Sequence, residues 1–217
     1  MLKPGLISGR REAGCDEAGR GPLAGPVVAA AVLLPDGYKN SILNDSKQLT
    51  ERQRNQLREE IEREASAWAV ATVDAQEIDK LNILHASTHA MCLAVKALLG
   101  DCASGVVFGG RKLGQEMPQF LLIDGNRFYN ETPLQYQCIV GGDAALAPIA
   151  AASVLAKTHR DELMMRLHEE YPQYHWDRNK GYPAPVHREA IRKYGTTPYH
   201  RLTFNLLGES PQLEFQF

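Results

Sequence analysis

The apolar positions of this chain fall into short runs of strand length and longer runs with helical spacing. Two runs near the front, residues 13–17 and 27–34, flank a turn rich in glycine and proline, and this pattern predicts an antiparallel pair of strands. Three further runs of strand length occur at residues 67–73, 120–124 and 134–140. The pattern therefore predicts three strands early in the chain and two after its middle.

Apolar residues that recur every three or four positions predict the helices. The tetrapeptide Thr50-Glu51-Arg52-Gln53 has the form of a capping box, and apolar residues follow it at helical spacing. The other predicted helices cover residues 74–79, 83–99, 149–170 and 186–194. Strands, a helical block, two more strands and further helices together indicate an α/β sheet flanked by helices.

In two segments the apolar residues follow neither the strand pattern nor the helical spacing. Residues 44–49 are polar, and we expect a loop there. Residues 101–118 contain four glycines and no sustained pattern, so we expect a flexible loop or a small excursion from the fold.

The composition is that of an ordinary globular protein of 217 residues, 44% hydrophobic and 23% charged. No apolar run reaches the roughly 18 residues that span a bilayer. The first 14 residues lack the apolar core of a signal peptide, so we expect a cytoplasmic protein. The four cysteines form no C-x-x-C pair and are expected to be reduced thiols: Cys15, Cys92, Cys102 and Cys138.

Charge is distributed unevenly along the chain. The net charge of −2 argues against bulk electrostatic binding of nucleic acid. Residues 156–204, however, hold nine Lys/Arg against six Asp/Glu. We therefore expect residues 1–155 to form a core with most of the sheet, and residues 156–217 to form a mildly basic helical part that packs on the core and contacts substrate. Such an imbalance is also usual for a solvated surface.

Four acids stand at the ends of predicted strands. Asp16 and Glu17 end the first strand, Asp124 ends the run FLLID, and Asp143 follows the run QYQCIV after two glycines. The ends of strands in one sheet can converge, so we expect these four carboxylates to meet. A single acid in such a position more often begins a turn or caps a helix.

Four carboxylates within a few ångströms of one another need a compensating positive charge. Oxygen ligands select hard divalent ions such as Mg²⁺ or Mn²⁺, and two ions roughly 3.5–4 Å apart are the arrangement for in-line phosphodiester cleavage. Adjacent side chains of a regular strand point to opposite faces, however. We therefore expect the first strand to end, twist or bulge at Asp16 and Glu17.

The same residues carry a resemblance to a known family. The stretch GCDEAGRGPLAGPVVAAAVLL resembles the opening motif of the type 2 ribonucleases H, and in particular that of bacterial ribonuclease HII. LLIDGNRF resembles the second acidic motif of the family, and GGDAALAPIAAASVLAKTHRD resembles the third. Four further segments resemble family segments and occur in the family's order: NDSKQL, DKLNILHA, HWDRNKGYP and TPYHRLTF. The resemblance therefore covers about residues 13–204.

The resemblance implies a ribonuclease-H-like mixed sheet flanked by helices, with a helical C-terminal extension. It also implies an endoribonuclease that hydrolyses the RNA strand of RNA–DNA hybrids and cuts 5′ to ribonucleotides embedded in DNA, leaving 3′-hydroxyl and 5′-phosphate ends. The implied catalytic groups, which would hold two Mg²⁺ or Mn²⁺ ions with substrate, are the four acids Asp16, Glu17, Asp124 and Asp143.

Substrate contacts follow from the same resemblance. The family's Gly-Arg-Gly motif contacts the ribonucleotide and corresponds to Gly19, Arg20 and Gly21. Tyr182 matches a tyrosine that works with this motif at an RNA–DNA junction. Without the resemblance, the Gly-x-Gly sequence is also explained by a turn that only reverses the chain. Tyr182 is likewise explained by a role in packing.

Further charged residues are candidates for supporting roles. The candidate phosphate contacts are Lys47, Lys157 and Lys180. Asp161 matches an acid of the third motif, and we expect it to orient a ligand or to pair with Lys157 or Arg160, although a plain helix-surface acid is an equal alternative. His85 and His89 have the spacing of a zinc pair but lack the Glu of H-E-x-x-H, so we expect them to be structural.

The sequence departs from the family in two places. Gly142 stands where the family usually has lysine, and residues 101–118 look longer than the usual loop. The C-terminal stretch QLEFQF, residues 212–217, is of the kind that engages the sliding clamp in some members, and is equally consistent with a segment that is disordered or packs on the fold.

Two alternatives to a ribonuclease HII are a ribonuclease HIII and a nucleic-acid-binding module without catalysis. A ribonuclease HIII usually has an additional N-terminal domain, whereas about a dozen residues precede the first strand here. A nucleic-acid-binding module without catalysis is disfavoured because all four acids are present. A metal-dependent cleavage assay separates the enzyme from the binding module.

Overall fold

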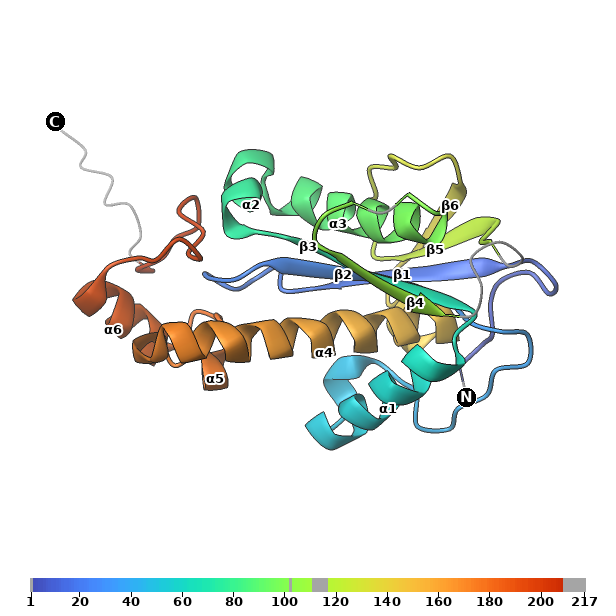
Figure 1. The fold of residues 1–217 in the computed structure, drawn as a ribbon, viewed down its shortest axis with the longest axis horizontal. Helices are drawn as coiled ribbons and strands as arrows, with labels where there is room; N and C mark the ends of the chain where they lie inside the picture. Colours follow the sequence, from blue (N-terminus) through green and yellow to red (C-terminus); the bar gives the residue numbers. More distant parts are fainter. Residues whose placement is uncertain (1, 102, 111–116, 209–217) are drawn as a thin grey trace, which may run out of the picture.

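The computed structural model describes residues 2–101, 103–110 and 117–208, and these form a six-stranded sheet between two layers of helices (Figure 1). The strands β1 to β6 cover Glu12–Ala18, Val27–Leu33, Ala67–Val73, Val106–Gly110, Phe120–Asp124 and Gln135–Ile139. Their order in the sheet is β4-β3-β2-β1-β5-β6. From β1 to β4, each strand pairs antiparallel with the next one along the chain. β5 runs parallel to β1, and β6 runs parallel to β5. The predicted antiparallel pair at the front and the mixed sheet are both confirmed.

Helices cover both faces of the sheet. They are α1 (Glu51–Glu64), α2 (Ala75–Leu81), α3 (Ile83–Leu98), α4 (Ala147–Glu170), α5 (Trp176–Asn179) and α6 (Pro185–Tyr194). α2 and α3 lie on one face, and α1 and α4 lie on the other (Figure 1). Three short 3-10 turns complete the elements: η1 (Ser46–Gln48), η2 (Gly142–Ala144) and η3 (Pro172–Tyr174). The predicted capping box at Thr50 and Gln53 is present at the start of α1.

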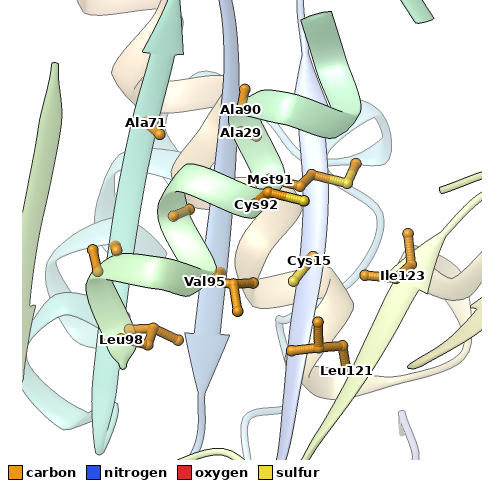
Figure 2. Close-up of a cluster of buried hydrophobic side chains, with 14 of the residues drawn as sticks. Cys15, Ala29, Ala71, Ala90, Met91, Cys92, Val95, Leu98, Leu121 and Ile123 are labelled. Carbon is orange, nitrogen blue, oxygen red and sulfur yellow. The ribbon is translucent and has the colours of Figure 1, made fainter. Parts of the chain in front are cut away.

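Each face of the sheet has its own apolar core. Between the sheet and α3, small residues of the strands pack against the helix, among them Cys15, Ala29 and Ala71 (Figure 2). On the other face, Val28 and Ala30 pack against the alanine-rich first half of α4. Consecutive strand residues therefore enter opposite cores, as the pleat of a strand buried on both faces requires.

The expectation of an irregular segment at residues 101–118 is wrong for part of that stretch. Residues 106–110 form the edge strand β4, which pairs antiparallel with β3 from Ala67 to Ala71. Val107 is exposed, and a Cβ at Gly109 would lie 2.9 Å from the ring of Trp68. The strand therefore exists because β3 offers a free edge, and Gly109 leaves room for the ring of Trp68.

The C-terminal part packs around the far end of α4. This helix extends past the sheet, and α5 and α6 lie at its C-terminal end (Figure 1). A small apolar cluster joins them, with Tyr174, Trp176 and Ile191 buried together. The predicted boundary between residues 155 and 156 falls inside α4, so the two parts share one continuous helix.

The cysteines in the described ranges are free thiols, with Cys15 and Cys92 buried and Cys138 partly buried. Cys102 lies outside the described residues, as does the segment 212–217. Among the helices described, none combines the length and the apolar composition that a membrane crossing requires.

Candidate active site

Three aspartates converge at one edge of the sheet. Asp16 lies on β1 and Asp124 ends β5, and the parallel pairing of Cys15 with Ile123 sets the two aspartates side by side. Asp143 lies in η2, which follows β6, the next parallel strand. Each aspartate offers one carboxylate oxygen, and these three oxygens lie within 4.8 Å of one another. The carboxyl ends of three neighbouring parallel strands thus form one cluster, which we call the aspartate cluster.

Glu17 approaches from the other face of the sheet. The ladder between β1 and β2 continues through Asp16, Glu17 and Ala18, so the strand neither ends nor bulges at the two acids, and these two of the expected alternatives are wrong. Asp16 faces Ser153 of α4, whereas Glu17 lines a cleft with residues of α3. Glu17 is consequently not one of the three acids in the cluster, but its charge acts on Asp16, and the charge of Asp124 acts on Glu17.

The cluster concentrates negative charge in a poorly hydrated place. Burial, followed by the charges of Glu17 and Asp124, raises the pKa of Asp16 well above its usual range. Burial, followed by the charges of Asp124 and Asp45, raises the pKa of Asp143. Burial also raises the pKa of Glu17, against the opposing charge of Arg20. The arrangement disfavours full ionisation unless a cation enters the site.

The loop before α1 reaches the cluster and contributes groups that the sequence interpretation missed. The Ser46 hydroxyl lies 2.8 Å from the Ser153 hydroxyl in the interior, and a hydrogen bond from Ser153 favours the ionised form of Asp16. Asp45 adds a further acid near Asp143. Asp45 is 98 positions from Asp143, and Ser46 is 107 positions from Ser153. No local sequence motif joins such distant residues.

Lys47 belongs to the same loop and lies close to the cluster. Its Nζ atom is 3.8 Å from Oδ2 of Asp143, and its side chain is 80% exposed. The lysine therefore lies beside the aspartate cluster, and most of its side chain is exposed to solvent. This position is compatible with the predicted contact to a phosphate.

The Gly19–Gly21 turn and Tyr182 lie next to each other. A Cβ placed on Gly21 would be 3.6 Å from Cε1 of Tyr182, whose side chain is exposed. Arg20 is half exposed and its guanidinium lies 3.3 Å from Oε1 of Glu17. The structure thus brings the turn, the tyrosine and one of the four predicted acids to one region of the surface.

The remaining predicted residues have local partners. Lys157 donates to Oδ1 of Asp161 at 2.7 Å, one helical turn apart on α4. Lys180 donates to the main-chain oxygen of Asp177 at 2.6 Å. Asp161 therefore has the lysine partner that was one of its expected alternatives.

The histidine pair on α3 does not share a site. His89 lies 2.9 Å from Oε1 of Glu131, and the ring of His85 stacks on Tyr129 with the centroids 4.1 Å apart. Each histidine has a separate neighbour, and a structural role for the pair stays an expectation.

A cleft of about 290 Å³ adjoins the aspartate cluster. Its walls include Glu17, Arg20 and Asp124, together with Asn126 and Arg127 from the loop after β5. A larger hollow of about 830 Å³ lies at the other end of β1 and β2, between residues 3–12 and 33–38. That hollow contains none of the predicted site residues, so the chemistry of the chain points to the smaller cleft.

The donor set fits hard divalent cations. All three groups of the cluster are carboxylates, and oxygen ligands favour Mg²⁺ or Mn²⁺ over softer metals. Two of the three aspartates are buried, and Lys47 is the cation nearest to Asp143 in the described part of the chain. A site of this kind can hold cations and, through them, the oxygens of a phosphodiester.

Comparison with known proteins gives one consistent result. A family model described as ribonuclease HII matches residues 13–207. The chain is 57% identical to a ribonuclease HII of Phocaeicola vulgatus and 55% identical to one of Bacteroides thetaiotaomicron, in both cases over 217 residues and 100% of each chain.

Solved structures share the fold. The ribonuclease H2 of Pyrococcus horikoshii matches with a TM-score of 0.69 at 24% identity, over 91% of this chain and 95% of that one. The ribonuclease HII of Archaeoglobus fulgidus, solved in complex with PCNA, matches with a TM-score of 0.68 at 21% identity, over 93% and 98% of the two chains. A Bst ribonuclease HIII in complex with Mn²⁺ has a TM-score of 0.65 at 18% identity, over 91% and 68%.

Proposed function

The chain belongs to the ribonuclease HII family and is a ribonuclease H, and we propose that it cuts 5′ to single ribonucleotides embedded in DNA as well as within RNA–DNA hybrids. The products are a 3′-hydroxyl and a 5′-phosphate. The observation that supports this proposal most strongly is the aspartate cluster, whose three carboxylate oxygens lie within 4.8 Å at the edge of the sheet.

The residues that would hold two divalent ions are Asp16, Asp124 and Asp143, with Glu17 as the fourth acid. When bound, such ions supply the activation of a water molecule and the stabilisation of the leaving oxygen that phosphodiester hydrolysis needs. Mg²⁺ and Mn²⁺ both suit carboxylate ligands, and Mg²⁺ is the ion we propose for the working enzyme. The carboxylates of the cluster would bind the ions and orient them. Because burial and neighbouring acids raise the pKa values of Asp16 and Asp143, a cation at the site would favour the ionised form of both.

Recognition of the ribonucleotide is assigned to the Gly19–Gly21 turn together with Tyr182. Main-chain groups of a turn can both donate to and accept from a 2′-hydroxyl, which distinguishes RNA from DNA. The exposed ring of Tyr182 next to Gly21 offers a surface for the sugar on the 3′ side of the cut. A deoxyribose fits against a ring more closely than a ribose, and this favours cleavage at a junction.

The mildly basic C-terminal part is proposed to contact the nucleic-acid backbone. Outside that part, Lys47 in the loop before α1 is the strongest candidate for a phosphate contact, because most of its side chain is exposed. Lys157 and Lys180 are second candidates, since each already donates to a neighbour, and Asp161 is proposed to hold Lys157 in place. The division into residues 1–155 and 156–217 remains a proposal about function, with α4 shared by both parts.

A contact with a sliding clamp is proposed for residues 212–217. The segment QLEFQF combines glutamine with apolar and aromatic residues, and an archaeal ribonuclease HII of similar fold is known in complex with PCNA. The proposal rests on this composition, because the segment lies outside the described residues. Deletion of residues 212–217 should abolish binding to the clamp and leave cleavage of a short duplex unchanged.

The proposed function is tested by cleavage of a duplex that contains one ribonucleotide, with Mg²⁺, with Mn²⁺ and with a chelator. A long RNA–DNA hybrid serves as the second substrate and an all-DNA duplex as the control. We expect metal-dependent cutting 5′ to the ribonucleotide, and product ends that a ligase and a phosphatase identify as 3′-hydroxyl and 5′-phosphate. Cutting of the hybrid alone would restrict the activity to hybrids and refute the proposed junction recognition.

A further inference from the structure

Two arginines are fully buried beneath the Gly19–Gly21 turn. The side chains of Arg160, on α4, and Arg201, after α6, are 1% and 0% exposed. Within the described residues, every hydrogen bond that either guanidinium donates ends on a main-chain carbonyl oxygen and none on a carboxylate. Arginine is almost never fully buried without an acidic partner, because the loss of hydration costs free energy that only a counter-charge or several hydrogen bonds offset.

The carbonyls that Arg201 contacts belong to the turn itself. Its Nη2 atom donates to the oxygen of Gly19 at 2.7 Å, and Nη1 donates to the oxygen of Arg20 at 3.0 Å. Nε and Nη2 also donate to the oxygen of Gly25 at 3.0 and 2.8 Å. The guanidinium of Arg201 is thus hydrogen-bonded to both ends of the segment that connects β1 to β2.

Arg160 joins the same segment to the loop that carries Tyr182. Its guanidinium donates to the oxygens of Pro26, Lys180 and Ala24 at 3.1, 3.0 and 3.3 Å. Gly19 adopts a φ of +96°, and a Cβ there would collide with Nε of Arg160. The turn and the Tyr182 loop are therefore held to one another from below.

The two bonds to Gly19 and Arg20 act on the peptide groups that face outward. The carbonyl of Gly19 shares its peptide group with the N–H of Arg20, and the carbonyl of Arg20 shares its peptide group with the N–H of Gly21. A cation that binds the carbonyl polarises the group and makes its N–H a stronger donor. Neither of these N–H groups donates to an acceptor in the part of the chain that the structure describes.

We propose that Arg160 and Arg201 are positioning residues that prepare the Gly19–Gly21 turn to donate its main-chain N–H groups to an oxygen of the nucleic acid next to the ribonucleotide. This inference rests on the proposed role of the turn in substrate binding. Burial, followed by the charge of Arg160, lowers the pKa of Arg201 to about 9, which leaves the guanidinium charged at neutral pH. Two like charges close together in the interior thus give the turn a permanent positive field.

A second set of bonds keeps Arg201 in place. The carboxylate of Asp79, on α2, accepts from the main-chain N–H groups of Leu202 and Thr203 at 2.7 and 3.1 Å, and from the Thr203 hydroxyl at 2.6 Å. Asp79 forms no hydrogen bond with either buried cation in the described part of the chain, although its negative charge acts on Arg201. Replacing Asp79 therefore loosens the arginine without removing its charge.

The test measures how well the protein distinguishes a duplex with one ribonucleotide from an all-DNA duplex of the same sequence. Dissociation constants for both are measured by fluorescence anisotropy in the Asp124→Asn background, which keeps the duplex intact. Arg201→Gln should lower the ratio of the two constants by about tenfold, the loss expected for one charge-assisted hydrogen bond. Arg201→Lys and Asp79→Ala should lower the ratio less, in the same direction.

Arg188→Gln is the matched control. Arg188 also donates to two main-chain carbonyls, those of Asn205 and Leu206, but these lie away from the turn. Its replacement should leave the ratio unchanged. A general loss of stability weakens binding to both duplexes equally, so the ratio isolates the recognition of the ribonucleotide from a purely structural effect.

The outcomes separate this inference from the proposed function. If the Asp124→Asn protein itself binds both duplexes equally, the proposed role of the turn is wrong and the inference falls with it. In the other case the Asp124→Asn protein distinguishes the two duplexes. If a folded Arg201→Gln variant in that background then gives the same ratio of dissociation constants, the turn works without the charge of Arg201, and only the inference about the arginines is overturned. Should Arg201→Gln fail to fold, an unchanged ratio in both Arg201→Lys and Asp79→Ala overturns it.

Discussion

The main-chain N–H of Gly142 donates to Oδ1 of Asp124 across 2.8 Å, so that the residue before one aspartate of the cluster is bonded to another. A Cβ at position 142 would lie 2.5 Å from Cδ1 of Ile149 and 3.3 Å from Oδ1 of Asp124. The chain has little room for a side chain here. Ile149 and the close turn together account for the glycine.

Gly142→Ala is expected to displace the turn and to weaken metal activation. Overpacking of this kind costs about 1–3 kcal/mol, and the metal concentration for half-maximal cleavage should rise because Asp124 and Asp143 are moved apart. Ile149→Val removes the methyl group that the new Cβ meets, so the double variant should recover part of both losses. Titration of Mg²⁺ against cleavage rate, with thermal unfolding of all four proteins, measures this, and equal losses in single and double variants would refute the steric explanation.

The acids of the cluster predict how stability depends on pH and metal. Burial and neighbouring acids raise the pKa values of Asp16 and Asp143 in the folded protein. The stability that each contributes is therefore fully present below about pH 4, the pKa of an unfolded aspartate, and is lost as the pH rises through the raised value. Protons and cations compete for the same oxygens.

Thermal unfolding across this pH range, with and without Mg²⁺, measures both effects. Through these groups, the metal-free protein should gain stability as the pH is lowered from 8 toward 5. The rise in melting temperature on adding Mg²⁺ should be largest at pH 8 and should shrink toward pH 5. Asp16→Asn should raise the melting temperature of the metal-free protein at pH 8 and diminish its response to metal. A metal-induced rise that is constant across this range would contradict the account of the cluster.

Tyr182→Ala is expected to impair cutting at a single embedded ribonucleotide more than cutting within a long hybrid. The ring lies beside Gly21 and should pack on the sugar 3′ to the cut, which is a deoxyribose only at the junction. Misplacement of the phosphate by about 1 Å can reduce the rate on the order of a hundredfold. Values of kcat/KM for both substrates at one metal concentration decide the matter, and equal fractional losses would leave Tyr182 as a packing residue.

The pair of hydroxyls behind Asp16 gives a prediction about stability. Ser153→Ala leaves the buried hydroxyl of Ser46 without its partner and should destabilise the fold by about 1–3 kcal/mol. Replacing both serines with alanine should be less harmful than the single change, because neither buried hydroxyl is then left without the other, and the bond from Ser153 to Asp16 is lost in both cases. Denaturant unfolding of the two single variants and the double variant measures the coupling. Additive losses would show that the two hydroxyls act independently.

Several features of the site follow from local sequence. The positions of Asp16, Asp124 and Asp143 relative to their strands were predictable, because apolar runs and glycines mark where each strand ends. The opposite orientations of Asp16 and Glu17 also follow from the pleat. The expected bulge is absent because the ladder with β2 continues through Ala18, and the two side chains reach the edge of the sheet from different faces.

Other features depend on contacts between distant segments. β4 was not predicted, since its glycine-rich residues become a strand only by pairing with the free edge of β3. Ser46 meets Ser153 through the packing of a loop on α4, and Arg201 reaches Gly19 across 182 positions of sequence. No local period reports such contacts, so the groups that support the acids and the turn are visible only in the fold.

The aspartate cluster is expected to bind the divalent ions required for cleavage, and one substitution tests this binding most directly. Asp124→Asn keeps the size of the side chain and an oxygen that can accept from Gly142, but it removes the charge that a cation needs. The rate of hybrid cleavage in saturating Mg²⁺ should fall by at least about a thousandfold, while the melting temperature of the metal-free protein stays at or above that of the wild type. Cleavage near the wild-type rate under these conditions would contradict the account.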